Sequence, residues 1–405
     1  MTGLIKRIIQ SLGSTTQVCF RVTFADSSAW QNMPGEPLVH FRFKTAGAQW
    51  RVMAFGHIGL LESYFDESLD VDGDFARAFR VGFDSRFGDA PGPLVRLRNH
   101  WHELTHSNRT ISQAKTNARF HYGLGADFYS LWLDLPLMMY TCGYWPEGTT
   151  TLEQAQRNKI DHVCRKIRLA RGERFVDIGC GFGGFMFRAH ETLGALGTGI
   201  NATTEQVDWL RGEIERRGLA AQLTVREADF REVDATYDKV VSIGVLEHAG
   251  RDQLDEVIKA HADFLRPAGL GMLHFIGHVG RYDTDLFIRK HVFPGGWIPS
   301  LADVLVAMER NGLEVVDVEN LRRHYAPTLD AWAERFESRW SEIHALAPQR
   351  FDERFRRIWR SYLVGCAEMF RSPAGYTHLF QIVFSKGNVT RDNYPMSRAH
   401  LHAAA

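Results

Sequence analysis

One acidic residue and a run of glycines form the most informative pattern in the chain. Residues 175–184, FVDIGCGFGG, place Asp177 at the end of a short apolar run, with Gly179, Gly181 and Gly183 at alternate positions after it. Glycines let such a turn pass close to a ligand, because a side chain would occupy the ligand's volume. The spacing D-x-G-x-G-x-G favours S-adenosylmethionine over a dinucleotide, whose fingerprint is G-x-G-x-x-G. An ordinary glycine-rich strand-to-helix turn is the alternative interpretation.

Polar and aromatic residues follow the next two predicted strands, and ligands of open α/β sheets bind at the carboxyl ends of the strands. Asn201, Thr203 and Gln206 follow the second strand, where many methyltransferases hold the ribose hydroxyls with an acid. The amide of Asn201 can still donate and accept hydrogen bonds, although a helix cap would also explain Thr203. After the third strand, Asp229 is suited to accept from the adenine amino group and Phe230 to stack on its ring.

An acid and a histidine, Glu247 and His274, follow the fourth and fifth predicted strands. At neighbouring strand ends over a cofactor pocket, these groups are suited to proton transfer or anion binding. The alternatives are a salt bridge for Glu247 and, for the adjacent His248, a hydrogen bond to a backbone carbonyl. His, Cys, Asp and Glu show no metal-ligand spacing in the sequence, so no metal site is expected.

Alternating strands and helices must position these residues. The predicted strands are residues 175–178, 197–200, 223–226, 237–243, 271–276, 314–320 and 379–385, and the predicted helices are residues 185–192, 203–217, 254–265, 301–310, 329–339 and 350–370. This alternation implies an α/β fold with a doubly wound, Rossmann-like sheet that is mostly parallel, with its last strand pair antiparallel. Before it, Thr151 can cap a helix over 151–167 whose apolar residues fall mainly on one face.

The first 90 residues are expected to form a smaller α+β domain without a cluster of catalytic residue types. Its predicted strands are residues 18–24, 38–43 and 50–55, and its predicted helices are residues 58–65 and 75–83, with a short amphipathic helix over the first 13 residues. A lipid- or partner-binding domain and a stabilising cap would both fit. The run GDAPGP at 88–93 marks a linker before a polar helix over about 94–120. The predicted domains are residues 1–90, a helical linker at 91–120, a catalytic domain at 121–390 and a tail at 391–405.

The composition excludes several classes of protein. The 48 basic and 48 acidic residues among 405 cancel, which gives no general attraction to nucleic acid. Five scattered cysteines without a C-x-x-C pair suit a reducing cytosol rather than a disulfide framework. No apolar run approaches the roughly 20 residues that span a bilayer.

Eight motifs make the chain resemble the cyclopropane fatty acid synthases and the related mycolic acid methyltransferases. They are HYGLGADFY (121–129), YTCGYW (140–145), VDIGCGFGG (176–184), VVSIGVLEHAG (240–250), LHFIG (273–277), VFPGGWIPS (292–300), HYAPTLDAW (324–332) and YLVGCAEMFR (362–371). The resemblance covers about residues 112–386, and several motifs are specific to that family. The bacterial synthases also carry an extra domain before the catalytic one. Phe182 and Asn201 depart from the residues usual there, Trp and Thr.

The resemblance implies two sets of site residues. Contacts to S-adenosylmethionine would come from Tyr140, Thr141, Asp177, Gly179, Gly181, Gly183, Asn201, Thr203, Gln206, Asp229 and Phe230. A bicarbonate ion would be held by Cys142, Glu247, His274, Ile276 and Tyr325. These five are called the anion-site residues below, and all but Ile276 would be catalytic. Cys366 aligns with another cysteine proposed as catalytic, but its apolar sequence surroundings favour a buried packing cysteine over a reactive thiolate.

The resemblance further implies a methyltransferase that acts on the double bond of unsaturated acyl chains in membrane phospholipids. An alkene is a poor nucleophile and a sulfonium methyl group a strong electrophile, so the transfer leaves a carbocation that must be shielded from water. The aromatic faces of Tyr144, Trp145 and Tyr325 are suited to stabilise it. Bicarbonate would remove a proton so that a cyclopropane ring closes. Because an anion beside a carboxylate is unfavourable, Glu247 is expected to be protonated or to share a proton.

Other products and other classes stay open. A hydride shift in the same cation would give a methylene-branched chain, or a methyl-branched chain with a partner reductase. A small-molecule N- or O-methyltransferase would leave Glu247, His274 and Tyr325 without a purpose, and a catalytically silent lipid-binding protein is at odds with the complete motifs. The protein is expected in the cytoplasm, peripherally attached to the inner face of the membrane through residues 1–90 or 133–139. The resemblance also implies a homodimer.

Overall fold

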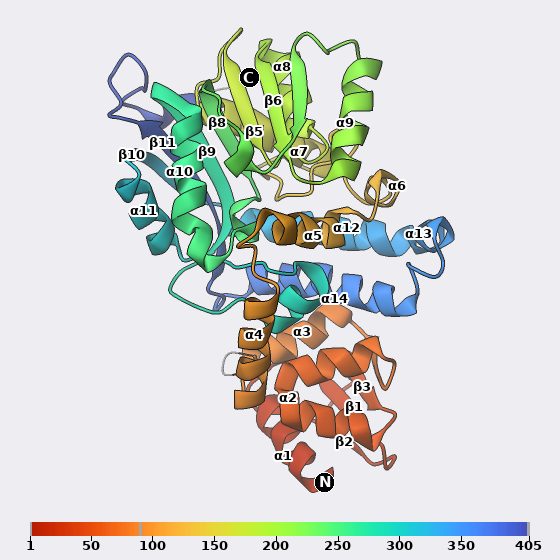
Figure 1. Cartoon of the computed structure of the whole chain (residues 1–405). Coiled ribbons are helices and arrows are strands. Elements are labelled where there is room, and N and C mark those ends of the chain that lie inside the picture. The colour runs from red at the N-terminus through yellow and green to blue at the C-terminus, as the bar shows by residue number, and fades with distance from the viewer. Residues whose placement is uncertain (1, 89–90, 403–405) are drawn as a thin grey trace. The chain divides into compact units, whose positions relative to one another are not determined.

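The computed structural model describes residues 2–88 and 91–402, which form two compact units (Figure 1). Unit 1 comprises Met1–Thr105, Asp285–Val292 and Trp332–Gly375, and unit 2 comprises His106–Thr284, Phe293–Ala331 and Tyr376–Ala405. The first boundary therefore falls after Thr105 rather than near residue 90, and two stretches from the predicted catalytic region join unit 1. Residues 89 and 90 of the predicted linker lie outside the described residues.

Unit 1 begins with a small sheet and four helices. Its elements are α1 (Thr2–Gly13), β1 (Phe20–Thr23), β2 (Ala29–Gln31), β3 (Val39–Phe43), α2 (Ala46–Phe65), β4 (Leu69–Gly73), α3 (Phe75–Asp84) and α4 (Pro93–Thr105). The strand order is β2-β1-β3-β4, with β1 and β3 parallel and the other pairs antiparallel. Two strands, β2 and β4, were not predicted, because β2 is only three residues long and β4 (LDVDG) is rich in residues that disfavour strands.

The strand predicted over residues 50–55 is wrong, because these residues belong to α2. Thr45 caps this helix by accepting a hydrogen bond at Oγ1 from the backbone N–H of Ala48 (3.1 Å). Aromatic and β-branched residues suggested a strand, but buried Ala48 and Val52 lie four positions apart and so share one helical face. Gly56, at φ 54°, interrupts the helix, which explains why its second half alone was recognised.

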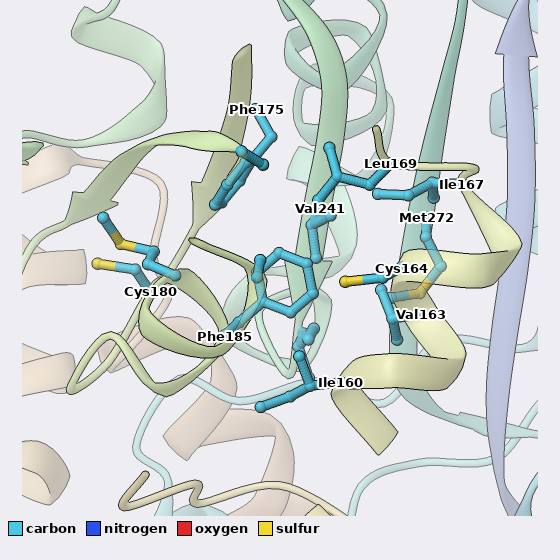
Figure 2. Close-up of a cluster of buried hydrophobic side chains, with 14 of the residues drawn as sticks. Ile160, Val163, Cys164, Ile167, Leu169, Phe175, Cys180, Phe185, Val241 and Met272 are labelled. Atoms are coloured by element: carbon cyan, nitrogen blue, oxygen red, sulfur yellow. The ribbon is translucent and has the colours of Figure 1, made fainter. Parts of the chain in front are cut away.

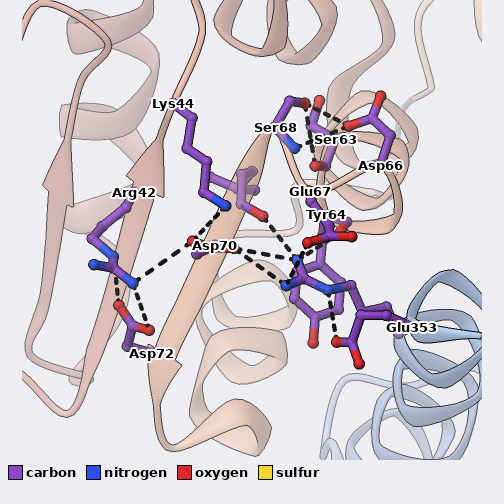
Figure 3. Close-up of polar contacts among 12 residues, drawn as sticks. Arg42, Lys44, Ser63, Tyr64, Asp66, Glu67, Ser68, Asp70, Asp72 and Glu353 are labelled. Atoms are coloured by element: carbon purple, nitrogen blue, oxygen red, sulfur yellow. Dashed lines mark hydrogen bonds and ion pairs between the residues drawn. The ribbon is translucent and has the colours of Figure 1, made fainter.

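The later stretch Trp332–Gly375 joins unit 1 through polar contacts of α14 (Glu353–Arg371). Arg357 of this helix donates to the backbone oxygen of Tyr64 (3.0 Å), pairs with Asp70 (3.3 Å) and lies over the Tyr64 ring at 4.8 Å. Figure 3 shows Tyr64 and Asp70 beside Glu353, within a network that also links Lys44 to Asp70. These contacts between residues about 290 positions apart could not be predicted from sequence spacing.

Unit 2 is built on a seven-stranded sheet with the order β10-β11-β9-β8-β5-β6-β7. The strands are β5 (Arg174–Ile178), β6 (Leu196–Asn201), β7 (Leu223–Glu227), β8 (Tyr237–Ile243), β9 (Leu265–His278), β10 (Leu313–Asn320) and β11 (Thr377–Lys386). All neighbours from β9 to β7 are parallel, and β11 is antiparallel to both β9 and β10. This arrangement confirms the predicted α/β fold class, mostly parallel sheet and antiparallel last pair.

Helices surround these strands in the predicted alternation. They are α5 (Ile111–Tyr122), α6 (Ala126–Ser130), α7 (Leu152–Lys166), α8 (Gly184–Leu193), α9 (Thr204–Arg216), α10 (Leu254–Phe264), α11 (Leu301–Arg310) and the first part of α12 (Arg322–Ser338), whereas the rest of α12 and all of α13 (Trp340–Leu346) belong to unit 1. The single polar helix expected over 94–120 is two helices, α4 and α5, because Thr110 caps a new helix at the backbone N–H of Gln113 (3.2 Å). Neither the break nor α13 was predicted.

Both faces of the large sheet are covered by apolar side chains, and this packing holds its strand β5 in place. In β5, Phe175 faces α7 and α8, where it joins Ile160 and Phe185 in one apolar cluster (Figure 2). The next residue, Val176, faces the opposite cluster with Val257 of α10. Because successive strand residues point to opposite faces, these two clusters hold β5 from both sides and so position the glycine turn that follows it.

Candidate active site

A pocket lies at the carboxyl ends of β5, β6, β7 and β8 in unit 2. Every residue predicted to contact the cofactor lines it except Gly183: Tyr140, Thr141, Asp177, Gly179, Gly181, Asn201, Thr203, Gln206, Asp229 and Phe230. The topology explains this convergence, because parallel strands end at the same edge of the sheet. The anion-site residues and Cys366 are not among the lining residues.

The glycines of the turn have different reasons to be glycine. Gly179 has φ 72°, and a Cβ there would lie 2.2 Å from Val245, so only glycine lets β5 and the loop after β8 approach each other. Gly181 has φ 53° and open space beside it. At Gly183, with φ 77°, a Cβ would lie 2.5 Å from Leu210 of α9. Gly183 therefore serves the packing of α8 against α9.

Asn201 shapes the loop after β6. Its Oδ1 accepts from the backbone N–H of Thr203 (3.0 Å), and its Nδ2 donates to Oε1 of Gln206 (3.0 Å). The side chain of Thr203 does not cap α9, so the capping role suggested for that hydroxyl is wrong. Asn201 instead forms a local turn that holds Thr203 at the start of α9, because Asn readily hydrogen-bonds a backbone group two residues ahead.

Asp229 is engaged by a neighbour on the pocket wall. Its carboxylate forms a bidentate pair with the guanidinium of Arg231 (2.7 and 2.8 Å) and also accepts from the Arg231 backbone. A carboxylate has about four lone-pair positions, so it retains room for one further donor. Arg231 and Phe230 both line the pocket, and the guanidinium lies 5.5 Å from the Phe230 ring centre. The role of Arg231 was not predicted from the sequence.

A buried lysine lies under the pocket. Lys159 of α7 donates from Nζ to Oγ1 of Thr141 (2.6 Å) and interacts electrostatically with Asp134 and Asp177. Burial lowers the pKa of Lys159 to about 8. Burial also raises the pKa of Asp177 to about 8, against the opposing effect of the Lys159 charge. Sequence analysis missed Lys159, although its position four residues before Val163 on the apolar face of α7 was a usable signal.

Glu247 and His274 come together around β9. Oε1 of Glu247 accepts from the backbone N–H of Ile276 (2.6 Å), and Ile276 is two residues from His274 on the same face of this strand. Oε2 of Glu247 is buried and has no hydrogen-bond partner within the described residues. Burial raises the pKa of Glu247 to about 7, in line with the expectation that this carboxyl holds or shares a proton.

A glutamine on β11 sets the state of His274. Nε2 of Gln381 lies 3.0 Å from Nδ1 of His274 in a fully buried pair. Burial, together with the charge of Lys159, lowers the pKa of His274 well below its usual value, so the ring is neutral. Since the Gln381 amide donates to Nδ1, the ring proton resides on Nε2. That N–H is buried and without a partner in the described part of the chain. Gln381 was not foreseen from the sequence.

The remaining anion-site residues are Cys142 and Tyr325, and Thr328 links the segment that contains Cys142 to α12, the helix that carries Tyr325. Thr328, one turn after Tyr325, accepts at Oγ1 from the backbone N–H of Gly143 (3.0 Å) and from Nε1 of Trp145 (2.9 Å). Tyr325 and Cys142 are both buried. Burial raises the pKa of the Cys142 thiol to about 12, so it is not an anion near neutral pH. Any polar contribution from this position therefore comes from the backbone or from a neutral thiol.

Two aromatic side chains expected to face a carbocation have other partners. The Tyr144 ring is stacked on His162 at 4.4 Å and lies 4.9 Å from His324. Trp145 is tied to Thr328 through its ring nitrogen.

Cys366 lies on α14 in unit 1, whereas the anion-site residues belong to unit 2. Burial raises the pKa of its thiol to about 12, and the nearby charge of Asp285 acts in the same direction. A reactive cysteine needs a lowered pKa. These surroundings support the packing interpretation of Cys366.

Five further polar residues line the pocket without having been predicted: Asn108, Asn117, Tyr122, His248 and Gln253. Nε2 of His248 lies 2.7 Å from the Tyr122 hydroxyl, so the ring bonds a side chain rather than the expected backbone carbonyl. Burial lowers the pKa of His248 to about 4, so the ring is neutral and one of its two nitrogens carries a proton. Tyr122 stands within the HYG motif, which was the available signal.

No helix in residues 2–88 or 91–402 has the length and apolar character needed to cross a bilayer. Over the same residues, His, Cys, Asp and Glu side chains form no group that could hold a metal ion.

Comparison with known proteins places the chain among lipid-modifying enzymes. The family model for mycolic acid cyclopropane synthetase matches residues 109–382. A probable fatty acid methyltransferase of Pseudomonas putida is 36% identical over 336 residues, which cover 80% of this chain and 81% of that protein. The cyclopropane-fatty-acyl-phospholipid synthase of Escherichia coli (strain K12) is 32% identical over 341 residues, covering 83% and 85%. The crystal structure of mycolic acid cyclopropane synthase CmaA1 complexed with SAH and CTAB has a TM-score of 0.62 and 31% identity over 67% of this chain and 98% of that one.

Proposed function

Because the chain belongs to the mycolic acid cyclopropane synthetase family of S-adenosylmethionine-dependent methyltransferases, we propose that it methylates the double bond of unsaturated acyl chains in phospholipids and closes a cyclopropane ring. The observation that carries this proposal is the pair of unpartnered buried atoms at Glu247 and His274. Closing the ring requires a proton to be removed, and a buried carboxyl with a raised pKa and a buried neutral histidine N–H are suited to hold that proton or to bind the anion that takes it.

The pocket residues fit S-adenosylmethionine. The open space at Gly181 admits a ligand close to the backbone, and Phe230 offers an aromatic face for a base. Asp177, as a carboxylate, would face the positively charged amino-acid and sulfonium end of the cofactor. When bound, the cofactor supplies an electrophilic methyl group. The protein's part is to orient this group and to exclude water from the carbocation that forms on the acyl chain.

The anion-site residues fit a bicarbonate ion. Nε2–H of His274 is a buried neutral donor, and Glu247, with a pKa raised to about 7, can hold the proton that an anion beside it requires. Tyr325 and the backbone near Cys142 would complete the site. When bound, bicarbonate supplies the base that takes a proton from the transferred methyl group. The buried Gln381 keeps His274 in the tautomer that donates towards the site.

A labelled-methyl experiment tests the proposal. The purified protein is incubated with deuteriomethyl S-adenosylmethionine and vesicles of a monounsaturated phospholipid, and the recovered lipid is examined by mass spectrometry and proton NMR. The expected product has gained one carbon, has lost one deuteron from the methyl group and shows cyclopropane resonances. Unlabelled lipid, from folded protein that binds S-adenosylmethionine, would refute a lipid substrate.

A branched product is the second candidate, and the name of the Pseudomonas putida relative, a probable fatty acid methyltransferase, favours keeping it. A hydride shift in the same cation, followed by loss of a proton from the transferred methyl group, would give an exocyclic methylene group, which a separate reductase could convert to a methyl branch. The same NMR spectrum separates the outcomes, because alkene resonances replace those of the ring. Since the substrate lies in a bilayer, we place the reaction at the cytoplasmic face of the membrane.

A further inference from the structure

Helix α4 of unit 1 carries an exposed apolar stripe. Leu94, Leu97, Trp101 and Leu104 are 51%, 65%, 67% and 56% exposed. Their spacing of three, four and three residues places all four on one face of the helix. These residues are called the α4 stripe below. Single exposed apolar residues are ordinary on a protein surface, but a continuous stripe that includes a tryptophan marks an interaction site.

The opposite side of α4 faces its own unit and is largely polar. Asn99 accepts from Nη1 of Arg289 (3.1 Å), and Glu103 pairs with the same guanidinium (3.3 Å). Val95 is the one buried apolar residue of this helix. The helix is thus oriented opposite to the usual arrangement, with polar groups inside and apolar groups outside. Since burial of its apolar face would be favourable, this orientation needs an external partner to explain it.

The charges around the stripe are positive. Arg96 and Arg98 are exposed on α4, and its one acid, Glu103, is engaged by Arg289. The guanidinium of Arg98 lies 4.2 Å from the centre of the Phe55 ring on α2, which in turn contacts Trp50 at 6.2 Å. Trp50 is itself 54% exposed, so the surface continues from α4 onto α2 and gains a second tryptophan.

We propose that the α4 stripe docks this protein on anionic phospholipid membranes. The leucines and tryptophans would enter the boundary between head groups and acyl chains, while the arginines bind lipid phosphates. This inference rests on the proposed function, because a phospholipid substrate requires a docking surface. It also differs from the location expected at residues 133–139, where Leu135 is exposed but Leu133, Leu137, Met138 and Met139 are buried.

A second copy of the chain fits this surface less well. A stable interface buries about 800 Å² on each partner, and the stripe has four side chains on a 13-residue helix. A twofold contact through α4 would also bring Arg96 and Arg98 of both copies together. Like charges there would oppose association, whereas an anionic lipid surface complements them.

Vesicle flotation tests the proposal without any catalysis. The full chain is mixed with vesicles of monounsaturated phosphatidylethanolamine and phosphatidylglycerol, and the bound fraction is measured. We expect the variant L97Q/W101Q to bind at least about tenfold more weakly than the wild type, because two apolar anchors are lost. The matched control is V306Q/L346Q, which changes two exposed apolar residues elsewhere and should bind as the wild type. Circular dichroism establishes that each variant is folded.

A second pair of measurements addresses charge and the alternative partner. The variant R96Q/R98Q should lose the preference for phosphatidylglycerol over phosphatidylcholine vesicles. Sedimentation velocity of L97Q/W101Q should give the same oligomeric state as the wild type. Undiminished flotation of L97Q/W101Q would overturn the proposal, and so would a dimer that dissociates in this variant while vesicle binding stays intact.

The docking surface and the proposed function fail in different ways. If the reaction is as proposed, L97Q/W101Q should methylate a detergent-dispersed unsaturated phospholipid as fast as the wild type and lose activity only on vesicles. If flotation depends on the stripe but no lipid is ever methylated, the docking surface stands and the proposed substrate does not. If the wild type methylates phospholipid in vesicles but does not bind them through the α4 stripe, the proposed substrate stands and the docking surface does not.

Discussion

The cofactor pocket and the anion-site residues are built in different ways. Most of the pocket is formed by short loops at the ends of four neighbouring strands, and other parts of its wall come from Asn108, α5 and residues 138–141. The anion-site residues come from the segment after α6, the loop after β8, strand β9 and helix α12, and Gln381 of β11 supports them. The pocket is built mainly on the adjacent strand ends of one sheet, whereas the anion-site residues depend on the packing of elements that are distant in the chain. The pocket should therefore tolerate changes that abolish chemistry at the anion site.

The largest effect should come from Glu247→Gln. The amide keeps the size of the side chain but cannot share a proton, so we expect ring formation to fall by about 10²–10⁴-fold. The affinity for S-adenosylmethionine, measured by calorimetry, should stay within about twofold, because Glu247 does not line the pocket. Full ring-forming activity in this variant would remove Glu247 from the mechanism.

Asp177→Asn, in contrast to Glu247→Gln, should change the affinity for S-adenosylmethionine. With the pKa of the free carboxyl near about 8, this group is mostly neutral below that pH and ionised above it. A sulfonium cation prefers the ionised form, so the affinity of the wild type for S-adenosylmethionine should decrease as the pH falls below about 8. In Asp177→Asn we expect binding about tenfold weaker at pH 9 and independent of pH. An unchanged pH profile would mean that Asp177 does not face the cation.

Gln381→Leu tests the anion site without changing a residue that would contact the cofactor or the bicarbonate ion. The loss of the bond to Nδ1 frees the His274 ring to place its proton on either nitrogen, so we expect turnover about tenfold lower and unchanged cofactor affinity. Gln381→Asn is the matched control, because it keeps an amide that is too short to reach the ring. If both variants turn over as the wild type does, the tautomer of His274 has no influence on the reaction.

The smallest effect should be that of Cys366→Ala. A neutral, packed thiol contributes no nucleophile, so activity should stay within about twofold while the melting temperature falls by a few degrees. Rates are compared at a temperature well below both melting points. Loss of activity in folded protein would restore the interpretation of Cys366 as catalytic.

The strands and α-helices of unit 2 from β5 to α10 were predicted within a few residues of their observed ends. Their alternation and helical spacing arise from burial on each face, which the order of apolar residues reveals. The strand predicted over 50–55 was wrong, and the exposed apolar stripe of α4 was not predicted. In both cases the types of the residues do not reveal which face of the element is covered by the rest of the protein.

The α/β sheet, the glycine turn at its centre and the residues at the strand ends could all be predicted from the sequence, since they follow from the periodicity of apolar residues and the conformations that glycine permits. Which of those residues are buried depends on tertiary packing, and burial is what raises the pKa of Glu247 and Asp177. Tertiary packing also brought Lys159, Thr328 and Gln381 to the site from separate elements. These contacts join positions far apart in the chain, and no spacing rule records them.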